Sequence, residues 1–248
     1  MISQERLLVL TVLFTMALGV SLTLGPGIDL PYGLALALLA GVSVPYLLHT
    51  HPAYVFSPVR LIIPAGVALA APSIARLLAN NSVVLVGVFG PPTLLYACIY
   101  AEYQVVRPST SGKAQIARLL LTLAAYVVAL AIFVLLEDAK ARALVSAPLA
   151  AVTGGLLALR LFTVEQRQEA RTGLYAAVIG LTMAEVIWPL NYWVLSAAAG
   201  AAALLMVFYV VVGVTHHLLA RDASWRLVVE YVSVGATGAL CIVMASRL

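Results

Sequence analysis

The sequence has few charged residues. Asp, Glu, Lys and Arg make up 10% of its 248 residues, whereas 63% of the residues are hydrophobic. Soluble domains are typically about 25% charged and about 45–50% apolar. The chain therefore lacks the polar surface that a water-soluble fold requires, and its composition indicates an integral membrane protein with the lipid bilayer as its main partner.

Most motifs that would identify a chemistry are also absent. The sequence contains no Asp-rich diphosphate motif, no His-Glu-x-x-His, no Gly-x-Ser-x-Gly and no phosphate-binding loop, so an enzyme has no positive signature. Its Lys and Arg residues form no polybasic arm, which argues against a nucleic-acid partner. Cys98 and Cys241, the two cysteines, lie inside apolar runs and are interpreted as packing residues. We therefore expect no cofactor and favour a non-enzymatic role.

Long hydrophobic runs dominate what the sequence does contain. A transmembrane helix needs about 20 predominantly apolar residues, and nine segments approach this length. These segments are Leu7–Leu24, Pro31–Leu48, Val59–Leu78, Val83–Val105, Ile116–Leu136, Ala143–Phe162, Gly173–Leu190, Tyr192–Thr215 and Leu227–Ser246. The connections are short, so the sequence predicts an all-α, polytopic transmembrane bundle of about nine spans in one membrane domain over residues 1–248. Eight spans remain the alternative, if the third or fourth segment enters the membrane without crossing it.

The Lys and Arg residues predict how the chain is oriented. With nine spans and a cytoplasmic N-terminus, ten of the 14 basic residues fall in cytoplasmic segments and four fall outside. This excess agrees with the positive-inside rule. The first run lacks a small-residue cleavage pattern after it, so we interpret it as an uncleaved helix rather than a signal peptide.

Small residues are concentrated in the last three segments. Ala176, Gly180 and Ala184 recur every fourth residue in the seventh segment, and the eighth contains the alanine-rich run around Gly200. Small residues allow helix backbones to approach closely in lipid. We expect them to form a tight C-terminal helix subdomain over residues 173–246 or the face of an oligomer, and the pattern does not distinguish these two arrangements.

Glu185 is the one acidic residue that lies well inside an apolar run. A charge at that depth is costly, so an acid within a membrane span is a candidate functional group. By position, Arg76 is the best candidate for a partner, and Asn191 and Asn80 are possible hydrogen-bond partners. Glu185 is either a proton or cation site that lines a cavity, or a structural acid that is protonated and bonded to a neighbouring helix or that leans out to the interface beside Trp188.

Pro91 and Pro92 interrupt the fourth segment near its middle. Two adjacent prolines remove backbone donors and clash with the preceding helical turn. One interpretation is a discontinuous helix that frames a binding site, as in many transporters. The other, which we favour, is a packed kink, because proline is common in membrane helices.

Four histidines are weak candidates for a metal or haem site. In the predicted topology His49, His51, His216 and His217 all lie at cytoplasmic helix ends and could therefore meet. No cysteine or carboxylate at a fixed spacing completes a zinc set. We favour the interpretation that they are interfacial residues and that no metal is bound.

Acidic residues near the ends of segments are less informative. Glu102 and Glu230 lie toward the predicted cytoplasmic side, and Glu137 and Asp138 toward the outer side. Each can reach the headgroups or pair locally, so we interpret all four as interfacial anchors.

The C-terminal quarter carries three short patterns. They are Glu185-x-x-Trp188, Tyr209-x-x-x-Gly213 and Arg226-x-x-x-Glu230-Tyr231. Together they resemble an uncharacterised family of bacterial multi-pass membrane proteins without an assigned function. The resemblance implies a location in a bacterial inner membrane, and it implies no activity and no catalytic residues.

Three functional hypotheses follow from these features. The leading one is a small permease or ion- or proton-coupled transporter, with Glu185 as the titrating group and Pro91–Pro92 at a broken helix. The second is a structural or assembly subunit whose small-residue faces bind other membrane subunits or further copies of the chain. The third is a lipid-processing enzyme with a lateral opening near the cytoplasmic leaflet.

Overall fold

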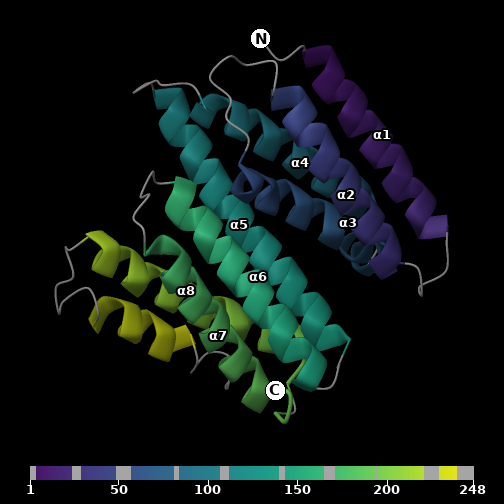
Figure 1. The fold of residues 1–248 in the computed structure, drawn as a ribbon. Coiled ribbons are helices and arrows are strands. Elements are labelled where there is room, and N and C mark those ends of the chain that lie inside the picture. The colour runs from purple at the N-terminus through teal and green to yellow at the C-terminus, as the bar shows by residue number, and fades with distance from the viewer. Residues whose placement is uncertain are drawn as a thin grey trace. The chain divides into compact units, whose positions relative to one another are not determined.

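The structure is a computed structural model, and it describes nine stretches of the chain. They comprise residues 4–23, 29–48, 57–80, 84–106, 112–139, 143–164, 171–193, 195–220 and 229–238. Regular structure within these stretches is helical throughout (Figure 1). This confirms the predicted all-α helical bundle, as expected for a chain whose backbone polar groups must be satisfied internally in lipid.

Seven of the described helices are long and apolar enough to cross a membrane. They correspond to seven of the nine predicted spans. The second predicted span contains a shorter apolar helix, Pro31–Leu47, within α2. Of the ninth, only helical residues 229–238 are described. The protein is therefore a multi-pass membrane protein, and the choice between eight and nine spans stays a prediction.

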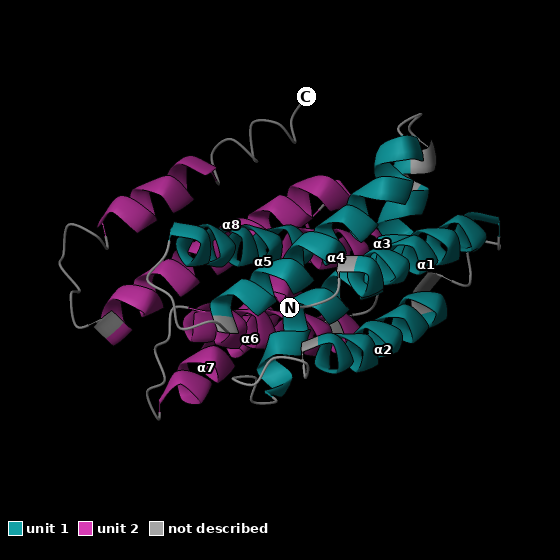
Figure 2. Ribbon diagram, turned by 90° about the horizontal axis from the view of Figure 1, so that it is seen from above, with its two compact units in different colours: residues 1–128 teal, residues 129–248 magenta. Residues whose placement is uncertain are grey.

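The chain divides into two compact units, residues 1–128 and residues 129–248 (Figure 2). Unit 1 contains the first four α-helices, a short 3-10 helix and most of the fifth α-helix. Their bounds are α1 Gln4–Thr23, α2 Asp29–Leu48, η2 Pro58–Leu61, α3 Ile62–Asn80, α4 Val84–Val106 and α5 Gly112–Asp138. Unit 2 contains the end of α5, then α6 Ala143–Val164, α7 Thr172–Leu190, α8 Ala197–Ala220 and helical residues 229–238.

Hydrogen bonds between helices establish the direction of the first three helices of unit 1. The Tyr32 hydroxyl near the start of α2 donates to the Ala17 carbonyl near the end of α1, at 3.0 Å. At the same end of α1, Nη2 of Arg76 from the last part of α3 donates to the Ser21 carbonyl at 2.9 Å. The end of α1 thus lies beside the start of α2 and the end of α3, as in an up-and-down bundle.

Glycines permit close contact between neighbouring helices of unit 1. A Cβ atom on Gly87 of α4 would lie 2.8 Å from the Ala75 carbonyl oxygen of α3, and a Cβ on Gly33 of α2 would overlap the Leu69 carbonyl of α3. Because only hydrogen occupies these positions, the backbones can pack directly against each other.

α4 continues without interruption through Pro91 and Pro92. The segment is helical from Val84 to Val106, and both proline rings are buried. The helix is therefore not divided at the double proline, and the interpretation of these residues as packed within a helix is the one that the backbone supports.

The closest helix pair in unit 2 is formed by α6 and α7, and glycines on both helices explain it. A Cβ on Gly180 would lie 2.5 Å from the Ala151 carbonyl oxygen, and a Cβ on Gly155 would lie 3.2 Å from the Ala176 carbonyl oxygen. Two of the recurring small residues of the seventh predicted span, Ala176 and Gly180, thus pack against α6 within this unit.

α7 is followed by a turn at residues 191–193, and α8 begins later than the predicted Tyr192. The amides of Asn191, Tyr192 and Trp193 donate to carbonyls of the last turn of α7. α8 starts at Ala197, where the Ser196 hydroxyl accepts a 3.3 Å hydrogen bond from the Ala199 amide. This serine N-cap places the helix start after the aromatic residues.

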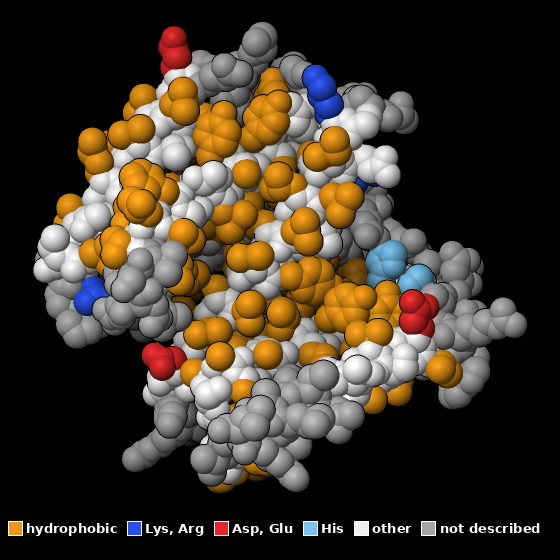
Figure 3. Space-filling model, turned by 180° about the vertical axis from the view of Figure 1, so that it is seen from behind, with side chains coloured by type: hydrophobic (Ala, Val, Ile, Leu, Met, Phe, Trp, Pro, Cys, Tyr) orange, Lys and Arg blue, Asp and Glu red, His pale blue; other side chains and the backbone are white. Residues whose placement is uncertain are grey.

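The surface carries large hydrophobic side chains. Leu144 is 86% exposed and Leu38, Val42 and Leu85 are each 73% exposed. On the face drawn in Figure 3, hydrophobic side chains predominate and charged side chains stand toward the margins. A soluble monomer rarely exposes such continuous apolar surface, whereas a surface that contacts acyl chains requires it.

Candidate functional site

Glu185, the main predicted site residue, is exposed on α7 of unit 2. It belongs to a row along one side of the helix that includes Leu181, which is 60% exposed, and Trp188, which is also 60% exposed. Functional acids in membrane proteins almost always face the interior of a bundle or a water-filled cavity. Within unit 2, Glu185 does not face the interior, and its predicted role as a proton or cation site stays a prediction.

Two of the predicted partners of Glu185, Arg76 and Asn191, each form a hydrogen bond within their own unit. Arg76 donates to the Ser21 carbonyl in unit 1, as described above. Nδ2 of Asn191 donates to Oγ of Ser146 at 2.8 Å, which connects the end of α7 to the first turn of α6. A pairing of Arg76 with Glu185 stays a prediction, since the two residues belong to different units.

His216 and His217 lie near the end of α8 in an aromatic cluster. Their ring centroids are 5.6 Å apart, and the His217 ring is 5.8 Å from that of Tyr231. The Tyr231 ring is in turn 5.6 Å from Tyr209. His49 and His51 lie outside the described residues, and no group of three potential metal ligands occurs among the residues that are described.

Glu102 is the buried acid that sequence reasoning ranked too low. It lies on α4 of unit 1 within the candidate span Val84–Val105, and only 1% of its surface is exposed. This burial argues against an anchor that reaches the headgroups, and the alternative of local pairing stays a prediction. Four residues separate Glu102 from the helix end at Val106, a distance of about 6 Å. Its proximity to the helix end suggested an anchor; only packing reveals that the side chain faces inward.

Two arginines accompany Glu102 at the same end of unit 1. Arg60 lies in η2, directly before α3, and Arg118 lies in the second turn of α5, which begins soon after α4 ends. Each has one guanidinium nitrogen, Nη1 of Arg60 and Nε of Arg118, that is buried without a hydrogen bond inside the described residues. One oxygen of Glu102, Oε2, is in the same state, although Glu102 and Arg60 each make another interaction. Such atoms are typically satisfied by water, an ion or a ligand.

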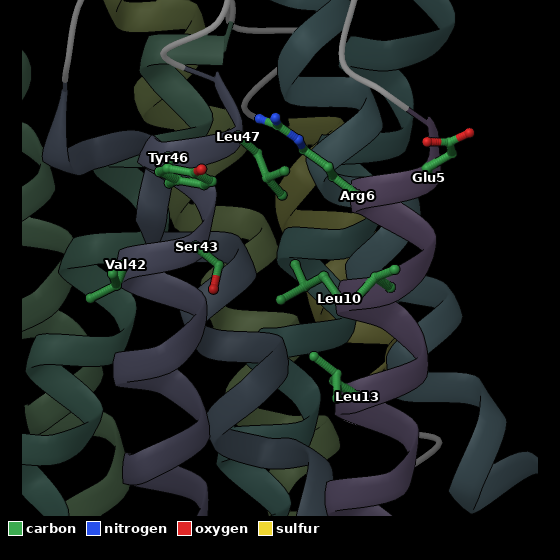
Figure 4. Close-up of a pocket in the computed structure, with 9 residues that line it drawn as sticks. Glu5, Arg6, Leu10, Leu13, Val42, Ser43, Tyr46 and Leu47 are labelled. Atoms are coloured by element: carbon green, nitrogen blue, oxygen red, sulfur yellow. The ribbon is translucent and has the colours of Figure 1, made fainter.

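A groove between α1 and α2 lies at this end of unit 1 as well. Its volume is about 620 Å³, which is within the range of ordinary ligand sites, about 300–1,000 Å³. Arg6, Tyr46 and Leu47 line one end, and Leu10, Leu13 and Val42 lie further along (Figure 4). We call this feature the α1–α2 groove.

Comparison with known proteins assigns the chain to a family. A family model described as a protein of unknown function, DUF5656, matches residues 9–245. The chain belongs to the DUF5656 family. This confirms the resemblance to a family without an assigned function, and it extends that relationship from the C-terminal quarter to nearly the whole sequence.

Comparisons with curated proteins and with solved structures found no further relative of this DUF5656 protein. No curated protein and no solved structure matches the chain. Glu102, its neighbouring arginines and the α1–α2 groove are therefore the features of the chain that indicate a function.

Proposed function

We propose that this DUF5656 protein is a small proton-coupled membrane carrier in which the Glu102 carboxyl takes up the coupling proton. The observation that carries the proposal is the burial of Glu102 in a membrane-spanning helix, with 1% of its surface exposed. An ionised carboxylate removed from water is costly, so an acid at such a position favours protonation or pairing with a cation. A group that exchanges between these two states can couple proton movement to that of a solute.

The arginines at the same end suggest the charge of that solute. Arg118 retains a buried guanidinium nitrogen, Nε, without a hydrogen bond among the described residues, and Arg60 adds a second positive charge at this end. Guanidinium groups bind carboxylate and phosphate oxygens strongly. A small anion could thus be held by Arg118, with Arg60 nearby, while Glu102 is protonated, and its release would accompany loss of the proton.

Reconstitution into liposomes tests the proposal. An inward acid gradient is imposed, a pH-sensitive dye is trapped inside, and small carboxylates, inorganic phosphate, amino acids, sugars and monovalent cations are supplied one at a time. We expect at least one small anion to increase proton entry and to accumulate inside with the gradient. Proton entry unchanged by every compound would contradict the proposal.

Glu102→Gln and Glu185→Gln form a matched pair for the same assay. Glutamine preserves shape but cannot exchange a proton, so Glu102→Gln should abolish accumulation driven by the pH gradient. Glu185→Gln should leave it unchanged, because Glu185 is exposed on its helix. If only Glu185→Gln abolishes coupling, the proton site is Glu185, as predicted from the sequence, and not Glu102.

A second candidate function rests on the exposed row on α7. Leu174, Leu181 and Trp188 are each at least 60% exposed, and Glu185 lies among them. An acid in a lipid-facing row carries a free-energy cost. A partner helix that covers the acid would reduce this cost. This favours an assembly subunit. Light scattering of the purified protein tests it, since Glu185→Leu should then change the mass of the complex and leave any carrier activity intact.

A further inference from the structure

The α1–α2 groove combines a positive end with an apolar length. Arg6 is exposed at the end where α1 begins, and the Arg6 side chain extends toward Leu47 of α2 (Figure 4). Glu5 also lines this end, and its carboxylate points away from α2 (Figure 4). Below this end the walls are aliphatic. Val42 is 73% exposed and Leu13 is 58% exposed, so the groove is open along the surface that faces the acyl chains.

Hydroxyl groups lie near the positive end of the groove. Tyr46 is 67% exposed and follows Val42 by one helical turn, so that both side chains line the groove from α2. The Ser43 hydroxyl already donates to the Leu39 carbonyl at 2.7 Å and retains acceptor capacity only. The Tyr46 hydroxyl can donate to an oxygen, and a guanidinium group can donate two parallel hydrogen bonds to a phosphate.

We propose that the α1–α2 groove binds one anionic phospholipid. Its phosphate is held by the Arg6 guanidinium and the Tyr46 hydroxyl, and one acyl chain lies along Leu13 and Val42. This order of polar and apolar groups matches the order in a lipid, with the charged group at the membrane surface and hydrocarbon beneath it. Basic pockets between transmembrane helices bind anionic headgroups in the same way.

The charge of the groove selects among lipids. A zwitterionic lipid brings its own cation close to Arg6 and weakens the attraction, whereas a phosphatidylglycerol headgroup brings only the negative phosphate. A free phosphate ion would use Arg6 but would gain nothing from Leu13 and Val42. The structure therefore predicts that the acyl chain and the anionic headgroup are both required. This inference does not depend on the proposed carrier function, because it concerns different residues.

Native mass spectrometry of the full-length protein in detergent tests the proposal. The protein is incubated in turn with phosphatidylglycerol, phosphatidylcholine and inorganic phosphate, and the bound species are counted. We expect one phosphatidylglycerol to bind about tenfold more tightly than phosphatidylcholine, which corresponds to one charge-assisted contact. Inorganic phosphate should neither bind detectably nor displace the lipid. Equal binding of both lipids, or displacement by phosphate, would overturn the proposal.

Three variants separate a specific site from general attraction. Arg6→Gln removes the phosphate contact and should reduce the preference for phosphatidylglycerol about tenfold. Lys113→Gln is the matched control, because Lys113 is also exposed at the start of a helix at this end of unit 1. Val42→Trp fills the apolar part from an exposed position and should block both lipids. High salt screens exposed charges, so under that condition Arg6→Gln should still weaken lipid binding and Lys113→Gln should not. Equal effects of the two substitutions would show nonspecific attraction and overturn the site. Unchanged lipid binding by Val42→Trp would do the same.

Discussion

The side chains of Asn191 and Ser146 join the end of α7 to the start of α6. Nδ2 of Asn191 lies 2.8 Å from Oγ of Ser146, and Ser146 is fully buried. The bond therefore closes the pair of helices at the end opposite to the connection between them. Together with the glycine contacts along their length, it holds α6 and α7 in one register.

Loss of this hydrogen bond should destabilise unit 2. We expect Ser146→Ala and Asn191→Ala each to reduce the free energy of unfolding by about 0.6–1.7 kcal/mol, from the average to the maximum found for interhelical hydrogen bonds in lipid. The double variant should cost less than the sum of the two, because both substitutions remove the same bond. Unfolding in mixed micelles measures the three values. Strict additivity would show that the two side chains do not act together.

The contact of Gly180 with Ala151 predicts a strong dependence on side-chain size. Gly180→Ala places a methyl group 2.5 Å from a backbone oxygen that cannot rotate away, so we expect a loss of about 1–3 kcal/mol in unfolding free energy. Gly173→Ala is the control on the same helix, since nothing lies within 4 Å of its Cβ position. It should be neutral or slightly stabilising, as alanine is the better helix former. Equal stability of the two variants would contradict the close packing of α6 and α7.

The ring of Tyr231 occupies the space in front of Gly213 on α8. A Cβ atom on Gly213 would overlap this ring, so Gly213→Ala should displace the tyrosine and lower stability by about 1 kcal/mol. That loss corresponds to a fall in Tm of about 2–4 °C for a chain of this size. Adding Tyr231→Leu should restore part of the loss. A double variant less stable than either single variant would show that the two residues do not compete for this space.

The orientation predicted from the basic residues can be tested at the two ends of α5. Lys113 and Asp138 are both exposed and lie at opposite ends of this 27-residue helix. In a background without other cysteines, Lys113→Cys should react with an impermeant maleimide from the cytoplasmic side only, and Asp138→Cys from the outer side only. The reverse result would invert the predicted topology, and labelling of both from one side would show that α5 does not cross the membrane.

Hydrophobic length predicted most of the helices. The predicted spans at residues 83–105 and 173–190 agree closely with α4 and α7, because in lipid an apolar run of this length has no alternative to an α-helix. The start of α8 was wrong by five residues, Tyr192 instead of Ala197. Hydropathy does not register a serine cap, and the aromatic residues before it are as hydrophobic as a helix interior.

The candidate site was harder to predict. Glu185 stood out because it lies inside its apolar run, five residues before the predicted end at Leu190. Glu102 was set aside because it lies three residues before the predicted end at Val105. In the structure Glu102 is buried and Glu185 is exposed on its helix. Distance along a helix gives the depth of a residue, whereas the direction in which its side chain points depends on which neighbours cover that side of the helix. A span that is apolar on every side has no polar face to indicate this direction.

Composition and residue order established that the chain is a multi-pass, all-α membrane protein, because lipid imposes one solution on long apolar segments. The contacts between helices established the remainder: which glycines meet a backbone, that Asn191 binds Ser146, that Glu102 faces inward, and that Arg6 closes one end of a groove. These relationships join residues far apart in the chain. They depend on the rotation and crossing of packed helices, which no single apolar segment encodes.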